Sequence, residues 1–261
     1  MEFDGIIPTN SSLSNYIVQQ HVMRYVFASK YVRNKIVLDV ACGAGYGSHF
    51  LATSGAKRVF GVDIDKRAVS FAKEYYTHPR VTYIQGDITN LPFPDEFFDV
   101  IISFETIEHL PQPEACVREI RRVLKDNGIF ICSTPNIKYT KHPPYHLHEF
   151  YPNEFFDLLE SNFREVKRYG QYISYFQRLD DLFMPKARLL KVASSILSIL
   201  PKGRIIGKII KSKVTKPTYT NPSMICPLKI DQIDISVFDK NKVVSLRGRG
   251  ILRIMIGVCK K

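Results

Sequence analysis

Three aspartates follow short apolar runs at equal spacing in the first third of the chain. Asp39 lies in the run 36–40, Asp63 ends the run 58–63, and Asp87 follows the run 81–85, so that 24 residues separate each aspartate from the next. If these runs are parallel strands, their carboxyl ends meet at one edge of a sheet. Carboxylates there would accept hydrogen bonds from hydroxyls and amines and would attract a cation.

A glycine-rich turn, residues 43–47, follows the first aspartate. Such a turn between a strand and a helix is the general nucleotide site of open α/β sheets. A diphosphate requires a positive field, but no Lys or Arg lies between Asp39 and Ala56. The acids instead suit a ligand with a ribose diol, an exocyclic amine and a positive charge, as in S-adenosylmethionine.

These motifs resemble the class I S-adenosylmethionine-dependent methyltransferases over about residues 20–171. The residues 39–45, reading DVACGAG, are similar to the family's first motif, and residues 98–110 are similar to its fourth strand and the loop that faces the methyl group. The resemblance implies S-adenosylmethionine as cofactor. The cofactor contacts it implies are Asp39, Ala41, Gly43, Gly45, Tyr46, Asp63, Ile64, Asp87, Ile88, Ser103 and Phe104. Tyr46 either covers the methionine end of the cofactor or packs in the core.

Alternating strand and helix patterns predict an α/β fold. We expect a doubly wound, Rossmann-like, mostly parallel seven-stranded sheet with helices on both faces and an antiparallel final strand. The expected strands are 35–40, 58–62, 81–85, 98–104, 129–133, 164–169 and 251–258. The expected helices are 14–31, 47–53, 66–76, 114–124 and 152–161.

The order of these elements predicts one domain with an insertion. Residues 1–34 form a helical segment over the cofactor site, 35–171 the methyltransferase core, 172–245 a basic insertion or lid, and 246–261 the final strand. The scattered cysteines and the lack of a secretory signal favour a cytoplasmic protein.

Positive charge is concentrated late in the chain. The net charge is +12, and residues 182–217 contain nine basic residues and no acidic one. This segment is either solvated surface or a surface for an anionic membrane or lipid-linked phosphate, which would make the protein peripheral to the membrane. Nucleic acid is disfavoured, because no aromatic side chain lies between Met184 and Pro217 to stack on bases.

Two histidines are candidates for a general base. His109 follows the predicted fourth strand and His146 follows the fifth, on the side of the expected ligand. Either ring could instead only hold its loop in place. His142, His148 and Glu149 near His146 raise the possibility of a metal site, but no metal is predicted, since no further ligand cluster is evident in the sequence.

The motifs favour methylation of a hydroxyl. A Pro-Pro-Tyr sequence at 143–145 is similar to a motif of enzymes that methylate amino groups of nucleic-acid bases, but it follows the fifth strand instead of the fourth. Elements such as residues 21–25, HVMRY, resemble a subgroup that accompanies surface-polysaccharide or glycolipid biosynthesis. We therefore expect O-methylation of a small-molecule, glycan or glycolipid acceptor. The alternatives are a non-catalytic S-adenosylmethionine-binding protein and an RNA methyltransferase.

Overall fold

The structure, a computed structural model, describes residues 16–140, 142–174 and 250–261. Apart from residues 173–174 and 250–251, these belong to one compact unit of the chain. The predicted insertion 172–245, with its basic segment 182–217, lies outside the described residues except for 172–174, which end a strand, and its role stays a prediction. None of the helices in the described part of the chain is long and apolar enough to cross a bilayer.

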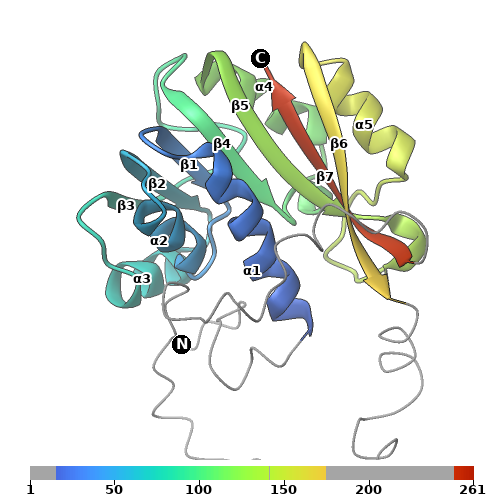
Figure 1. Cartoon of the computed structure of the whole chain (residues 1–261), viewed down its shortest axis with the longest axis horizontal. Coiled ribbons are helices and arrows are strands. Elements are labelled where there is room, and N and C mark those ends of the chain that lie inside the picture. The colour runs from blue at the N-terminus through green and yellow to red at the C-terminus, as the bar shows by residue number, and fades with distance from the viewer. Residues whose placement is uncertain (1–15, 141, 175–249) are drawn as a thin grey trace, which may run out of the picture. The chain divides into compact units, whose positions relative to one another are not determined.

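Seven strands form one sheet in the order β3-β2-β1-β4-β5-β7-β6 (Figure 1). Their bounds are β1 Ile36–Val40, β2 Arg58–Asp63, β3 Val81–Gln85, β4 Phe98–Phe104, β5 Leu124–Pro135, β6 Glu165–Ser174 and β7 Gly250–Lys260. β1 pairs in parallel with β2 and β4, β2 pairs with β3, and β4 pairs with β5. β7 is antiparallel to β5. The predicted mostly parallel sheet with an antiparallel final strand is confirmed.

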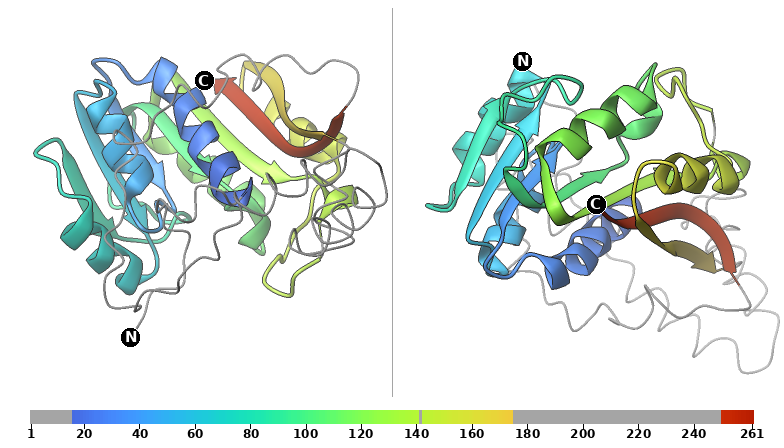
Figure 2. Two further views of the ribbon diagram at one scale, coloured as in Figure 1. Left: turned by 60° about the horizontal axis from the view of Figure 1, so that its bottom comes forward. Right: turned by 90° about the horizontal axis from the view of Figure 1, so that it is seen from above.

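Helices cover both faces of the sheet (Figures 1 and 2). They are α1 Tyr16–Ala28, α2 Tyr46–Thr53, α3 Lys66–Tyr75, α4 Pro113–Val123 and α5 Pro152–Glu160. Buried side chains of α1, α2 and α3 join one hydrophobic cluster, and those of α4 and α5 join a second cluster. This two-sided burial explains the nearly continuous apolar runs of β1 and β4.

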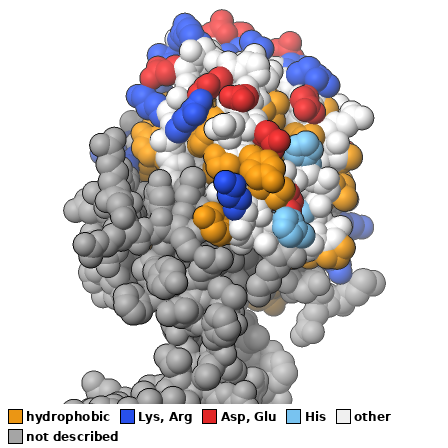
Figure 3. Space-filling model, turned by 90° about the vertical axis from the view of Figure 1, so that its right-hand side faces the viewer, with side chains coloured by type: hydrophobic (Ala, Val, Ile, Leu, Met, Phe, Trp, Pro, Cys, Tyr) orange, Lys and Arg blue, Asp and Glu red, His pale blue; other side chains and the backbone are white. Residues whose placement is uncertain are grey.

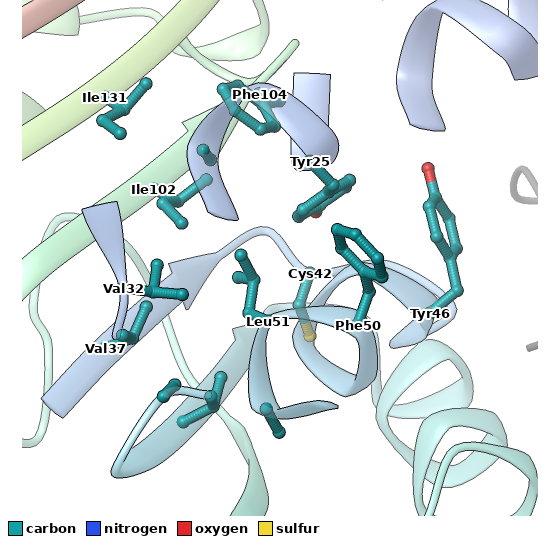
Figure 4. Packing of buried hydrophobic residues seen from close by; sticks show 14 of the residues in the cluster. Tyr25, Val32, Val37, Cys42, Tyr46, Phe50, Leu51, Ile102, Phe104 and Ile131 are labelled. Atoms are coloured by element: carbon teal, nitrogen blue, oxygen red, sulfur yellow. The ribbon is translucent and has the colours of Figure 1, made fainter. Parts of the chain in front are cut away.

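Tyr25 fixes α1 over the carboxyl ends of the central strands. Its ring meets Tyr46 edge to face at 5.5 Å between ring centroids, and Phe104 at 5.2 Å (Figure 4). Tyr46 begins α2 and Phe104 ends β4, so one buried ring connects a helix, the glycine turn and the neighbouring strand. Pairs of this kind contribute about 1 kcal/mol each beyond the area they bury.

The start of β5 differs from the prediction. Four residues separate the expected helix 114–124 from the expected strand 129–133, but α4 ends at Val123 and β5 begins directly after it at Leu124. Phe98 pairs with Leu124, and the register then shifts before Val100. Residues 125–128 have no partner in β4, and Asn127 has a left-handed φ of 61°, so β5 is irregular at this point.

Candidate active site

The glycine turn follows β1, and its backbone is left-handed at three positions. The φ angle is 56° at Ala41, 53° at Gly43 and 86° at Gly45. At Gly45 a side chain would lie 2.5 Å from the Cβ of Ala72, whereas at Gly43 a Cβ would meet nothing within 4 Å. Gly45 therefore allows α3 to pack closely, and Gly43 leaves space above the turn that a ligand can approach.

Asp63 holds the glycine turn against the end of β2. Its Oδ2 accepts a hydrogen bond from the amide of Gly43 at 2.8 Å, and its Oδ1 accepts one from the amide of Asp65 at 2.9 Å. The side chain is partly exposed. Because a carboxylate oxygen accepts more than one hydrogen bond, Asp63 retains the capacity to accept from a ribose diol.

Asp39 is fully buried, and its carboxylate bonds to neighbouring side chains instead of facing solvent. Its carboxylate accepts hydrogen bonds from the hydroxyls of Ser48 at 2.6 Å and Tyr25 at 3.1 Å. Burial raises the pKa of Asp39 from 3.8 to about 7, although the hydrogen bonds from Ser48 and Tyr25 oppose that rise. This buried position does not favour a direct contact between Asp39 and a cofactor. That contact stays a prediction.

We expect Asp39→Asn to remove a pH-dependent loss of stability. The pKa of Asp39 is higher in the folded chain than in the unfolded chain, so the folded chain holds this proton more firmly. The free energy of unfolding therefore falls as pH rises from about 4 to about 7. Between pH 5 and pH 8 the free energy of unfolding of the variant should gain about 2 kcal/mol relative to the wild type. Urea unfolding of both proteins at the two pH values measures this difference. A difference that is independent of pH would contradict the assignment.

The other predicted cofactor residues fall into an exposed and a buried group. Ile64 is 69% exposed beside Asp63, so its apolar face is available to a base. Asp87 is exposed and accepts hydrogen bonds from the amide and hydroxyl of Thr89, both at 2.8 Å. The buried group is Ile88, Ser103, Phe104 and Tyr46. Tyr46 packs against Tyr25, which supports the alternative that this ring belongs to the core. A contact between Tyr46 and the cofactor stays a prediction.

Arg24 is a site residue that the sequence did not assign. It lies in α1, is 1% exposed, and donates a hydrogen bond from Nη1 to Oε1 of Gln171 at 2.9 Å. Its Nε and Nη2 have no hydrogen-bond partner among the described residues, and Nη2 lies 4.0 Å from Oε2 of Glu105. A buried guanidinium with two open donors fits an anionic group such as the carboxylate of S-adenosylmethionine. The only sequence signal was the spacing of the HVMRY motif.

A second group of polar side chains lies beyond the end of β4. Glu108 and His109 belong to a short 3-10 helix, Ile107–His109, and His146 comes from the loop after β5. The amides of Leu147 and His148 both donate to the backbone carbonyl of Glu108, at 2.8 and 3.0 Å. These bonds bring the two predicted catalytic histidines together, with ring centroids 5.0 Å apart.

Glutamates surround the two histidines. Glu108 is 1% exposed and accepts a hydrogen bond from the hydroxyl of Thr134 at 3.1 Å. Burial, followed by the charge of Glu105, raises the pKa of Glu108 well above its ordinary value. Glu149 bonds to Nδ1 of His146 at 3.0 Å and to Nδ1 of His142. No pattern in the sequence indicated that Glu108 would join this group.

Comparison with known proteins finds similarity to methyltransferases. A methyltransferase domain family matches residues 38–132. A probable S-adenosylmethionine-dependent methyltransferase of Mycolicibacterium smegmatis is 36% identical over 160 residues, which are 59% of this chain and 61% of that protein. A fatty-acid O-methyltransferase of the same species is 29% identical over 136 residues, 51% of this chain and 49% of that protein. The chain therefore spans about half to three fifths of the length of these relatives.

A solved structure supports the fold. A methyltransferase from Archaeoglobus fulgidus that depends on S-adenosylmethionine superposes with a TM-score of 0.56 at 17% identity, covering 94% of this chain and 93% of that one. The matched region contains the glycine turn, Asp63 and Asp87, all at the carboxyl ends of parallel strands. Residues 38–132 are therefore similar in sequence to methyltransferase domains, and the fold around them is that of a methyltransferase that depends on S-adenosylmethionine.

Proposed function

We propose that the whole protein transfers a methyl group from S-adenosylmethionine to a hydroxyl oxygen of a small-molecule, glycan or glycolipid acceptor. The observation that carries the proposal is the Asp63 carboxylate, which holds the glycine turn in place and remains partly exposed beside it. When bound, the cofactor supplies a methyl group activated by a sulfonium, which becomes a neutral thioether as the acceptor oxygen gains the methyl and loses its proton.

The chain's own residues orient the cofactor and assist loss of the proton. Arg24 binds the carboxylate, Asp63 the ribose, and Asp87 the adenine amine. His109 and His146 act on the acceptor hydroxyl, most simply as a general base. The fatty-acid O-methyltransferase among the relatives supports an oxygen acceptor that has an apolar part. The glycan or glycolipid part of the proposal rests on the sequence resemblance to the polysaccharide-associated subgroup.

Asp63→Ala is expected to weaken S-adenosylmethionine binding about 30-fold. The variant loses charge-assisted hydrogen bonds to the ribose and the restraint on the amide of Gly43, together worth roughly 2 kcal/mol. Isothermal titration calorimetry measures the affinity.

Asp65→Ala is the matched control for this variant. Asp65 lies two residues away and caps α3 through the amide of Arg67. Its loss should lower the stability of the fold through the missing helix cap without changing the affinity. Equal affinities of Asp63→Ala and the wild type would contradict the assignment of the ribose site.

Release of S-adenosylhomocysteine with a panel of fatty-acid, glycan and glycolipid acceptors tests the reaction itself. Release that depends on one class of acceptor identifies the substrate. Cofactor binding without release against every acceptor would instead indicate a non-catalytic binding protein.

A further inference from the structure

We propose that Glu108, His109 and His146 bind a divalent transition-metal ion, and that this ion binds the acceptor hydroxyl. The metal-binding part stands on the geometry of these three side chains alone. The role of the ion toward the acceptor rests on the proposed function. The sequence had suggested a different set, in which His142, His148 and Glu149 accompany His146.

The three side chains present ligand atoms to one space. One imidazole nitrogen from each histidine and a carboxylate oxygen of Glu108 lie within 4.8 Å of one another. Ligands bonded to a tetrahedral ion at about 2.1 Å are roughly 3.4 Å apart. Binding therefore requires the side chains to move together by about 1 Å, which the partly exposed ring of His109 permits.

Hydrogen bonds orient both histidines for metal binding. Nδ1 of His109 lies 2.9 Å from the backbone carbonyl oxygen of Tyr145. A carbonyl only accepts hydrogen bonds, so Nδ1 carries the proton and Nε2 keeps a free lone pair. Nδ1 of His146 likewise faces Oε1 of Glu149 at 3.0 Å. An outer carbonyl or carboxylate that fixes the tautomer is the usual second layer around a metal-binding histidine.

The charge distribution also favours a cation. Glu108 is buried with the carboxylate of Glu105 near it, and the carboxylate of Glu149 bonds to His146. Arg24 is the cation that faces Glu105, at 4.0 Å. A buried carboxylate is costly unless a cation or hydrogen bonds compensate it. His109 and His146 are both partly exposed, so the site is accessible from solvent. Figure 3 shows one face of the molecule on which histidine side chains lie beside acidic and hydrophobic ones.

Two imidazoles and one carboxylate suit Zn²⁺, Mn²⁺, Co²⁺ or Fe²⁺, and three protein ligands leave positions open for substrate. A hydroxyl bound at an open position has a lowered pKa and loses its proton to solvent. The oxygen then bonds to the methyl carbon, as the carbon–sulfur bond breaks and its electron pair stays on sulfur. In this scheme the histidines act on the proton through the ion and do not accept it themselves.

Metal binding is tested on the full chain after treatment with a chelator and dialysis. Calorimetric titration with Zn²⁺ or Mn²⁺ should show one ion per chain, and Co²⁺ should give a visible absorption band. Glu108→Gln and His146→Ala should each weaken binding at least 10-fold. Glu149→Gln should weaken it 10- to 100-fold through the orientation of His146. His148→Ala is the matched control from the same loop and should bind normally.

Circular dichroism checks that each variant folds, and His146→Ala, at a partly exposed position, keeps the test valid if Glu108→Gln unfolds. Absence of stoichiometric binding, or binding unchanged in both variants, overturns the inference.

Activity in the presence of a chelator separates this inference from the proposed function. Loss of S-adenosylhomocysteine release with chelator, and recovery with added ion, supports both. Full release without any bound ion overturns the metal site and leaves methyl transfer with a histidine base. A bound ion without release for any acceptor supports the metal site and overturns the proposed function.

Discussion

His146→Ala is expected to lower turnover about 100-fold and to leave the affinity for S-adenosylmethionine within twofold of the wild type. Help with removal of an acceptor proton is worth roughly this factor or more, and it affects the chemical step only. Turnover should fall whether His146 accepts the proton itself or binds an ion. Single-turnover measurement of S-adenosylhomocysteine formation, beside calorimetry with the cofactor, gives both quantities.

His148→Ala is the control for that experiment. His148 lies in the same loop, its ring packs against Phe150 at 4.4 Å between centroids, and its bond to Glu108 uses the backbone amide. Turnover should stay close to the wild type. If His146→Ala and His109→Ala both kept full turnover, neither histidine would assist the proton transfer.

Gly47→Ala is expected to destabilise the fold by about 4 kcal/mol. A Cβ on Gly47 would lie 2.0 Å from Cζ of Tyr25 and 2.2 to 2.5 Å from two other atoms of that ring. The ring would have to leave its place between Phe104 and Tyr46 (Figure 4), which removes packing of the size lost in large-to-small core variants. Asp39 would lose a hydrogen bond as well. Urea unfolding measures the change.

A double-mutant cycle identifies the cause of that loss. In a Tyr25→Ala background the clash is absent, and Gly47→Ala should become neutral or stabilising by about 0.5 kcal/mol, since alanine is the better helix former. The same large loss in both backgrounds would show that the ring of Tyr25 is not the reason for glycine at this position.

The sequence predicted the strands and the acids because both signals are local. Asp63 and Asp87 each come directly after an apolar run, and parallel pairing of β1, β2 and β3 brings the ends of those runs to one edge. The burial of Asp39 could not be predicted from the sequence in the same way. Its burial depends on Tyr25 from a helix that precedes the sheet. The start of β5 at Leu124 was missed because Leu124 pairs with Phe98 ahead of residues 125–128, which have the composition of a turn and no partner in β4.

The remaining site residues meet through contacts between distant parts of the chain. Arg24 and Gln171 are 147 positions apart and bond across α1 and β6. Glu108 and His146 meet because amides of the loop after β5 bond to a carbonyl of the loop after β4. Neither contact follows from periodicity or spacing, since each depends on where a loop docks.

The bonds that join these two loops have a consequence for which substitutions the loops tolerate. Leu147 and His148 donate through their amides, and Tyr145 accepts through its carbonyl. Any amino acid except proline can make such amide bonds. The side chains of Tyr145 and Leu147 are 64% and 60% exposed. Substitution of Leu147 should therefore leave these backbone bonds intact and keep His146 close to His109. The ring of Tyr145 also contacts the rings of His109 and His146, at 5.6 and 5.3 Å between centroids, so its replacement removes side-chain packing as well.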